Sequence, residues 1–214
     1  MVSIDNTKLI LSAFFHSPSK PQYIRQITSN CELSYERVQH YLKELEKLKV
    51  LRSETKGKIK EYTINKKHEL VLKIFSILEM EKRQMFFSKN PQFQAWLANL
   101  SDELSKNLDK STAEIPFILL FGSTARGDAR AGSDVDILVV ARKIDLTLKK
   151  TINRQKAKLE ALSGKVFSFH LVDYSEFADK WKKEPVYATI WLDKIILFGE
   201  ENFWRKVLDK GEPL

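Results

Sequence analysis

The chain has 214 residues, 43% of them hydrophobic and 30% charged, and carries a formal net charge of +8. This is the composition of an ordinary globular protein, long enough for one large or two small domains. The single cysteine, Cys31, excludes an intrachain disulfide and a cysteine-based metal site. No apolar run approaches the ~20 residues of a membrane span, and the N-terminus lacks the basic start of a signal peptide. We therefore expect a cytoplasmic protein with no membrane association.

The excess positive charge is concentrated in the first part of the chain. Residues 1–90 hold 17 basic and 10 acidic side chains, whereas residues 91–214 hold 19 and 18. This asymmetry favours a polyanionic partner for the first part. The alternative is a basic surface that is simply solvated.

The N-terminal part has the pattern of three short helices followed by a hairpin. Apolar residues recur at helical spacing in three segments, and Ser34 is a good N-cap for the third of them. Two alternating segments then meet around Gly57, as paired strands do. The expected elements are helices over 6–16, from Pro21 to Ile27 and over 35–49, and strands over 50–53 and 61–64. The third helix is expected to bury Val38, either Tyr41 or Leu42, Leu45 and Leu48.

This order of elements over about residues 5–66 resembles a winged helix-turn-helix domain of the kind found in transcription regulators. The resemblance implies that the helix from Ser34 to Lys49 is a recognition helix and that double-stranded DNA is the polyanion. The same fold can instead serve protein contacts, with its lysines solvated. The residues expected to contact DNA are Ser34, Arg37, Gln39, His40 and Lys43 on the helix and Lys56, Lys58 and Lys60 on the wing.

Two helical patterns occupy the middle of the chain. The first, over 67–88, is apolar around more than half of its circumference, and Asn90-Pro91 interrupts it. The second runs over 92–108. Such a helix packs against a second copy of itself or connects two domains, and we favour a homodimer because winged-helix regulators commonly bind two half-sites.

The stretch from Ile115 to Ala141 carries the chemistry. Two apolar runs of strand length, 117–121 and 137–141, flank a glycine-containing loop. The second run is entered through Asp134-Val135-Asp136, and two like charges side by side contribute nothing to a buried strand. Because hard oxygen ligands are what Mg²⁺ prefers, the aspartate pair indicates a divalent-cation site.

Gly122-Ser123-Thr124-Ala125-Arg126-Gly127, followed by Ser133-Asp134-Val135-Asp136, resembles the signature of the minimal nucleotidyltransferases, in the DNA polymerase beta-like superfamily. The resemblance implies transfer of a nucleoside monophosphate from an NTP, with ATP expected, to a hydroxyl, with Mg²⁺ or Mn²⁺ as cofactor. It assigns Asp134 and Asp136 to the metal and to catalysis. It assigns the nucleotide to Gly122, Ser123, Arg126 and Ser133, although an ion pair of Arg126 with Asp128 or Asp134 is an alternative.

A third carboxylate normally completes the metal site from a later strand of this superfamily. The corresponding strand, expected over 165–173 after a basic helix over 147–162, offers His170 or Ser168 at that place, and Asp173 reads as a helix cap. A neutral imidazole suits Mg²⁺ poorly. The alternative function is therefore a transcription regulator whose nucleotidyltransferase domain is weak or inactive and serves as a nucleotide sensor or dimerisation module.

Together these patterns predict an α+β protein with three parts. The C-terminal region adds a helix from Glu184, a strand over 195–198 and a terminal helix. The resemblance implies antibiotics, nucleic-acid ends or protein hydroxyls as acceptors of the nucleotide, and a DNA-binding partner domain makes a small antibiotic the least attractive of the three. The three parts of the predicted α+β protein are a winged helix over 1–66, a helical connector over 67–110, and a nucleotidyltransferase domain over 111–214 with a mixed β-sheet flanked by helices.

Overall fold

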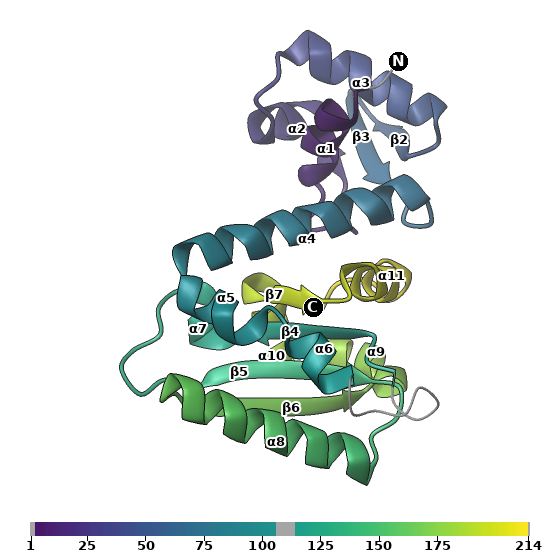
Figure 1. The fold of residues 1–214 in the computed structure, drawn as a ribbon. Helices are drawn as coiled ribbons and strands as arrows, with labels where there is room; N and C mark the ends of the chain where they lie inside the picture. The colour runs from purple at the N-terminus through teal and green to yellow at the C-terminus, as the bar shows by residue number, and fades with distance from the viewer. Residues whose placement is uncertain (1–2, 106–113, 214) are drawn as a thin grey trace. The chain divides into compact units, whose positions relative to one another are not determined.

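The computed structural model describes residues 3–105 and 114–213, apart from the side chain of Lys182. Contacts divide the chain into two compact units (Figure 1). Unit 1 contains the residues up to Leu78 together with Trp204–Glu212, and unit 2 contains Glu79–Phe203. None of the described helices combines the length and the apolar character that a membrane span needs. Within the described residues the chain is of mixed α and β structure, as the sequence predicts.

Unit 1 begins with three helices and a small antiparallel sheet in the order β1-β3-β2. Ser34 caps α3, its hydroxyl accepting a hydrogen bond from the Arg37 amide at 3.4 Å, as expected. The predicted hairpin is confirmed, with Gly57 at its turn. The bounds are α1 Ile4–Ser12, β1 Gln22–Tyr23, α2 Ile24–Asn30, α3 Tyr35–Lys47, β2 Leu51–Lys56 and β3 Ile59–Ile64.

Unit 1 differs from the sequence prediction at the ends of its helices. The first helix stops at Ser12, because two tight turns follow that bury both Phe14 and Phe15. Pro21 does not open a helix: it precedes β1, which pairs with β3 and was not predicted. The burial predicted for Leu48 is wrong, since α3 ends at Lys47 and Leu48 is 52% exposed. A left-handed residue at Lys49 then turns the chain so that Val50 enters the core instead.

The predicted connector consists of three helices. The first, α4, spans Glu69–Lys89 and ends at the predicted Asn90-Pro91 break. The predicted helix over 92–108 is wrong in its continuity: α5 spans Pro91–Leu97 and α6 spans Leu100–Ser105. The turn between them leaves both Leu97 and Leu100 buried. The end of the prediction, residues 106–108, lies outside the described residues.

Unit 2 is built on a mixed four-stranded sheet in the order β6-β5-β4-β7 (Figure 1). Strand β4 is antiparallel to both β5 and β7, whereas β5 and β6 are parallel. The antiparallel register sets Phe121, the last residue of β4, opposite Asp136 near the start of β5. The bounds are β4 Phe117–Phe121, β5 Val135–Ala141, β6 Phe167–Asp173 and β7 Ile195–Phe198.

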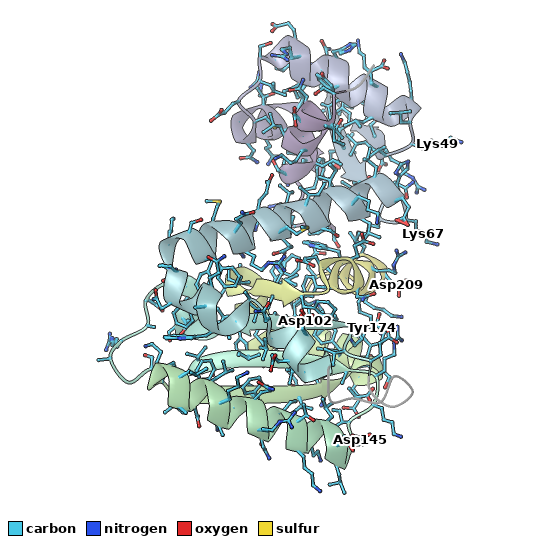
Figure 2. All side chains as sticks on the ribbon, in the orientation of Figure 1. Lys49, Lys67, Asp102, Asp145, Tyr174 and Asp209 are labelled. Atoms are coloured by element: carbon cyan, nitrogen blue, oxygen red, sulfur yellow. The ribbon has the colours of Figure 1, made fainter. Side chains whose placement is uncertain are left out.

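Helices cover both faces of this sheet. On one face, α8 (Leu146–Ser163) packs with α5 and α6 over Ile118, Leu120, Ile137 and Val139. Asp145, labelled in Figure 2, begins α8 by accepting a hydrogen bond from the Leu148 amide at 2.9 Å. On the other face, an aromatic cluster of Phe117, Phe177, Trp181, Tyr187, Trp191 and Phe203 joins β4 to α9 (Tyr174–Lys183), α10 (Pro185–Asp193) and the start of α11 (Glu200–Lys210).

A buried ion pair stands out within unit 2. The Glu79 carboxylate lies 3.4 Å from the Lys194 ammonium, and the two side chains are 0% and 3% exposed. The Lys194 ammonium also donates to the Trp191 carbonyl at 3.1 Å and lies over the Trp191 ring. Burial lowers the pKa of Lys194 to about 8, although Glu79 opposes the shift. The pair therefore fixes α4 to the segment between α10 and β7.

Candidate functional site

The nucleotidyltransferase-like loop starts directly at the end of β4. Gly122 adopts a φ of +72°, a conformation that few L-residues tolerate, and begins the short helix α7 (Gly122–Arg126). A Cβ added at Gly122 would lie 2.6 Å from the Asp136 carboxylate oxygen Oδ2. This residue therefore has to be glycine for two reasons, its backbone conformation and the close approach of a carboxylate.

Hydrogen bonds hold the rest of the loop against β5. The Thr124 hydroxyl donates to the Asp134 carbonyl at 3.4 Å, and the amides of Gly127 and Asp128 both donate to the Ser123 carbonyl. The Ser133 hydroxyl accepts from the Arg130 amide at 2.9 Å. The structure thus brings Gly122, Ser123, Asp134 and Asp136 to one end of β4 and β5.

Asp136 is the half-buried centre of this arrangement. Its side chain is 28% exposed, and burial raises the pKa of its carboxyl group above the usual range. The nearby charge of Asp134 acts in the same direction, whereas His170 opposes it. A carboxylate in this condition gains from a cation that neutralises it.

His170 and Ser168 are the two residues that the sequence offers in place of a third acid, and both lie on β6 beside β5. The Nε2 atom of His170 is 3.8 Å from Asp136 Oδ1, and its ring packs on Phe121 with centroids 5.3 Å apart. Ser168 is the register partner of Asp136 on the neighbouring strand. Asp173 caps α9, as predicted, by accepting from the Ser175 amide at 2.8 Å. Among the described residues, no group of three or more His, Cys, Asp or Glu side chains could hold a metal ion.

Arg126 is held by two carboxylates. Its Nε donates to Asp128 at 3.1 Å and its Nη1 to Asp193, at the end of α10, at 2.8 Å. The two acids raise the pKa of the guanidinium further. The ion pair with Asp128 is one of the alternatives that the sequence leaves open. Asp193 was missed, because nothing in the sequence links positions that lie 67 residues apart.

The sequence of this region matches a known family. Residues 102–191 match the family described as polymerase beta, nucleotidyltransferase. A Methanocaldococcus jannaschii protein named "Putative protein adenylyltransferase" is 30% identical over 125 residues, which is 55% of this chain and 82% of that protein. The chain belongs to the polymerase beta nucleotidyltransferase family.

A solved structure also resembles part of this chain. It is titled "Crystal structure of the toxin-antitoxin with AMP-PNP", and the similarity covers 52% of this chain and 82% of that chain at 20% identity and a TM-score of 0.35. At this level of similarity we draw no argument from it. The family assignment rests on the sequence matches.

In unit 1, the predicted DNA-contacting residues fall into two groups. Arg37, Gln39, His40 and Lys43 are exposed on α3, and Ser34 caps that helix. Lys56, Lys58 and Lys60 lie on the hairpin of β2 and β3. Three of these residues meet at one groove of about 550 Å³, which is lined by Gln39, Lys58 and Lys60 together with Tyr23, Ile24, Arg25, Tyr35, Ile59 and Tyr62. Arg25 and the tyrosines were not predicted from the sequence.

Proposed function

We propose that this chain transfers a nucleoside monophosphate, with AMP from ATP expected, to a hydroxyl of a protein acceptor, and that unit 1 binds duplex DNA. The observation that carries the transferase proposal is the cradle in which a glycine of positive φ lets a partly desolvated carboxylate approach the loop backbone. The family assignment supports nucleotidyl transfer as the reaction class. The protein acceptor is suggested by the name of the Methanocaldococcus jannaschii relative.

The residues of the loop bind and orient the nucleotide. Without a side chain at Gly122, a phosphate can approach the backbone closely, and the Ser123 amide and hydroxyl donate to its oxygens. Ser133 shapes the turn that leads into Asp134. Arg126 carries less net charge toward a phosphate than a free arginine does, because both of its partners are acids. We propose that Arg126 fixes α7 against α10. It contacts a phosphate only if the phosphate replaces Asp128 or Asp193 as its partner.

Two carboxylates fit the family's divalent cation. Mg²⁺ is commonly bound by one or two protein carboxylates together with substrate phosphates and water, so a third protein ligand is not required. Asp134 and Asp136 would hold it, and the cation would offset the burial and the smaller repulsion from Asp134 that raise the pKa of Asp136. When bound, Mg²⁺ or Mn²⁺ supplies screening of phosphate charge and eases loss of the acceptor proton.

The reaction balances without any further reactant. The acceptor oxygen forms a bond to the α-phosphorus of the NTP, and the bond from that phosphorus to the bridging oxygen breaks. Pyrophosphate leaves, and the hydroxyl proton passes to solvent. The protein's part is to orient the triphosphate along Gly122 and Ser123 and to keep the α-phosphate beside Asp136.

The proposal is tested by incubating the full chain with each α-labelled NTP, Mg²⁺ and a protein extract that supplies acceptor hydroxyls, and by measuring both the protein-bound label and the pyrophosphate released. A preference for ATP with Mg²⁺-dependent release supports it. Binding of NTPs without any release, at any Mg²⁺ or Mn²⁺ concentration, would favour the alternative, a transcription regulator that senses nucleotide.

His170 is the observation that favours this alternative, and it yields a prediction. An imidazole 3.8 Å from Asp136 leaves the site one carboxylate short of the family pattern. The substitution His170→Asp is expected to raise transfer by roughly tenfold and to lower the Mg²⁺ concentration needed, because a third oxygen ligand binds the cation more tightly. The matched control is His170→Asn, because asparagine has the shape of aspartate without its charge. Equal rates for the two variants would refute the idea that a missing acid limits the enzyme.

For unit 1, we propose a winged-helix DNA-binding module, with α3 as recognition helix. Its support is the order of three helices and a hairpin, the excess of basic residues, and the exposure of the α3 side chains. The domain limits expected from the sequence, 1–66, 67–110 and 111–214, belong to this proposal. We also propose a homodimer through α4, because the apolar side chains of Ile77 and Met80 on this helix are exposed and a second copy could cover them.

The three lysines of the wing differ in whether an acidic partner already neutralises their charge. Lys56 pairs with Glu61 and Lys60 pairs with Glu46, each at 2.9 Å, whereas Lys58 has no ion pair among the described residues. We expect Lys58→Ala to reduce the slope of log affinity against log salt by about one unit, since a released phosphate contact changes it by ~0.9. Lys56→Ala and Lys60→Ala should change it less. The measurement is a salt titration of duplex-DNA binding, and affinity that does not depend on salt would refute DNA binding.

A further inference from the structure

Strand β6 leaves one of its edges unpaired within the described part of unit 2. It is the outermost strand of the sheet and pairs only with β5. The Val135 amide donates to the Val166 carbonyl at 2.9 Å, so the peptide groups of every second residue from Val166 turn toward β5. Those of Phe167, Phe169 and Leu171 therefore turn outward, along the free edge.

Of these outward residues, only Phe167 has a hydrogen-bond partner for its backbone amide among the described residues. The Phe167 amide donates to the Glu160 carboxylate at 3.0 Å, which confirms its direction. For the outward amides and carbonyls of Phe169 and Leu171, no hydrogen-bond partner exists among the described residues. Unpaired backbone groups in a row are a template for an additional strand.

A basic groove runs beside this edge. It has a volume of about 290 Å³ and lies between β6 and α8, which run alongside one another in Figure 1. Helix α8 has five lysine or arginine residues and a single acid, Glu160. Lys149, Lys150 and Arg154 form no ion pair with any described residue. The groove is lined by Lys149, Ile152, Asn153, Lys156, Phe169 and Leu171.

The same strand reaches the candidate active site on its other face. Ser168 and His170 alternate with Phe169 and Leu171, and His170 contacts Asp136. Because neighbouring strands are usually about 5 Å apart, a strand added to the edge would lie about 5 Å from β6 and about 10 Å from β5. A hydroxyl side chain on the site face of that strand would be next to His170, on the same face of the sheet as Asp136.

We propose that the free edge of β6 and the groove under α8 bind an extended acidic segment of the protein acceptor by strand pairing. The proposal rests on the proposed function for its purpose, which is to deliver an acceptor hydroxyl to Asp136. Backbone pairing to Phe169 and Leu171 supplies affinity, and the lysines of the groove select acidic side chains on the α8 face of the added strand. The positive charge of α8 argues against a basic or neutral segment.

The test measures binding without catalysis. The probe is a fluorescein-labelled peptide of about ten residues in which valine and glutamate alternate, a length that covers the edge. A charge-reversed peptide with lysine in place of glutamate is the control ligand. We expect the acidic peptide to bind the full chain at least about tenfold more tightly, with affinity that weakens as salt rises.

Two matched pairs of variants locate the binding site. Leu171→Pro removes one outward amide and should weaken binding about tenfold or more, while Leu171→Ala keeps that amide and should change it less than about threefold. Lys149→Glu, in the groove, should weaken it about tenfold, whereas Lys150→Glu, on the same helix outside the groove, should have a smaller effect. The thermal midpoint of each variant checks its folding, and the lysine pair remains informative if Leu171→Pro does not fold.

Several outcomes would overturn the proposal. Equal binding of the acidic and basic peptides, or equal effects within both variant pairs, contradicts strand pairing at this edge. Loss of duplex-DNA binding in Lys149→Glu with unchanged peptide binding would assign α8 to nucleic acid instead. A concentration-dependent dimer that Leu171→Pro abolishes would show that a second copy covers the edge. The valine–glutamate peptide has no hydroxyl side chain, so its binding tests only the docking edge. Peptide binding together with no nucleotide transfer to any protein acceptor would refute the proposed function and leave the docking edge standing.

Discussion

Replacing Gly122 by alanine is expected to lower nucleotidyl transfer at least about 100-fold while the protein still folds. The new Cβ would lie 2.6 Å from Asp136 Oδ2, closer than such atoms approach, and the carboxylate would have to move. Since only the end of a flexible side chain has to shift, the fold survives. The cost in free energy of unfolding should be limited to about 1–2 kcal/mol for an L-residue at positive φ. Transfer rates and urea unfolding of the same preparation measure both effects.

Gly127 provides the matched control for this experiment. Its φ is +85°, and a Cβ there would meet no atom of the described residues within 4 Å. Gly127→Ala should therefore lose a similar free energy of unfolding, about 1–2 kcal/mol, but should keep its transfer rate within a few-fold. If the two alanine variants lose activity equally, the close approach of Gly122 to Asp136 has no catalytic importance.

The second large effect is expected in stability, at the buried pair of Glu79 and Lys194. Lys194→Met leaves the Glu79 carboxylate buried without its cation, and removing one partner of a buried pair costs about 3–5 kcal/mol. Glu79→Gln should cost less, because Lys194, with a pKa of about 8, can lose its proton inside the protein. The double variant should recover most of the loss, since two uncharged side chains need no compensation. Urea unfolding followed by tryptophan fluorescence measures all three.

The controls for this pair are an exposed ion pair and the pH. Lys180 pairs with Glu176 on the surface of α9, so Lys180→Met should leave the free energy of unfolding almost unchanged. Between pH 8 and the ~10.4 of an unfolded lysine, the unfolded chain binds more protons at Lys194 than the folded chain does. Stability from this residue should therefore rise with pH in that window, and the rise should be absent in Lys194→Met. A double variant as unstable as Lys194→Met would contradict the account of the pair.

The sequence predicts those parts of the structure that local rules determine. The apolar runs of β4 and β5, the N-caps Ser34 and Asp173, and the turn at Gly57 are all found, because each depends on residues within a few positions of one another. The nucleotidyltransferase loop is recognisable for the same reason: its glycines, serines and aspartates are spaced along a single strand-loop-strand unit.

What the sequence could not predict depends on distant contacts. The strand β1 exists because β3 pairs with it, and the turn between α5 and α6 interrupts a pattern that reads as continuous. Asp193 reaches Arg126, and Glu79 reaches Lys194, across long separations in the chain. The free edge of β6 follows from the order of the strands, which no local pattern contains. Of these contacts, the pair of Asp193 with Arg126 belongs to the candidate site, where it fixes the arginine.

The most direct test of nucleotidyl transfer at this site replaces Asp136 by asparagine. The full chain, Asp136→Asn and the control Asp179→Asn, an exposed acid of α9, are each incubated with α-labelled ATP and Mg²⁺. We expect pyrophosphate release by the wild type and by Asp179→Asn at similar rates. For Asp136→Asn we expect a loss of at least about 100-fold, as for removal of a principal electrostatic group of an active site. Release that survives in Asp136→Asn would contradict the central claim that this carboxylate, set against Gly122, is where the nucleotide is transferred.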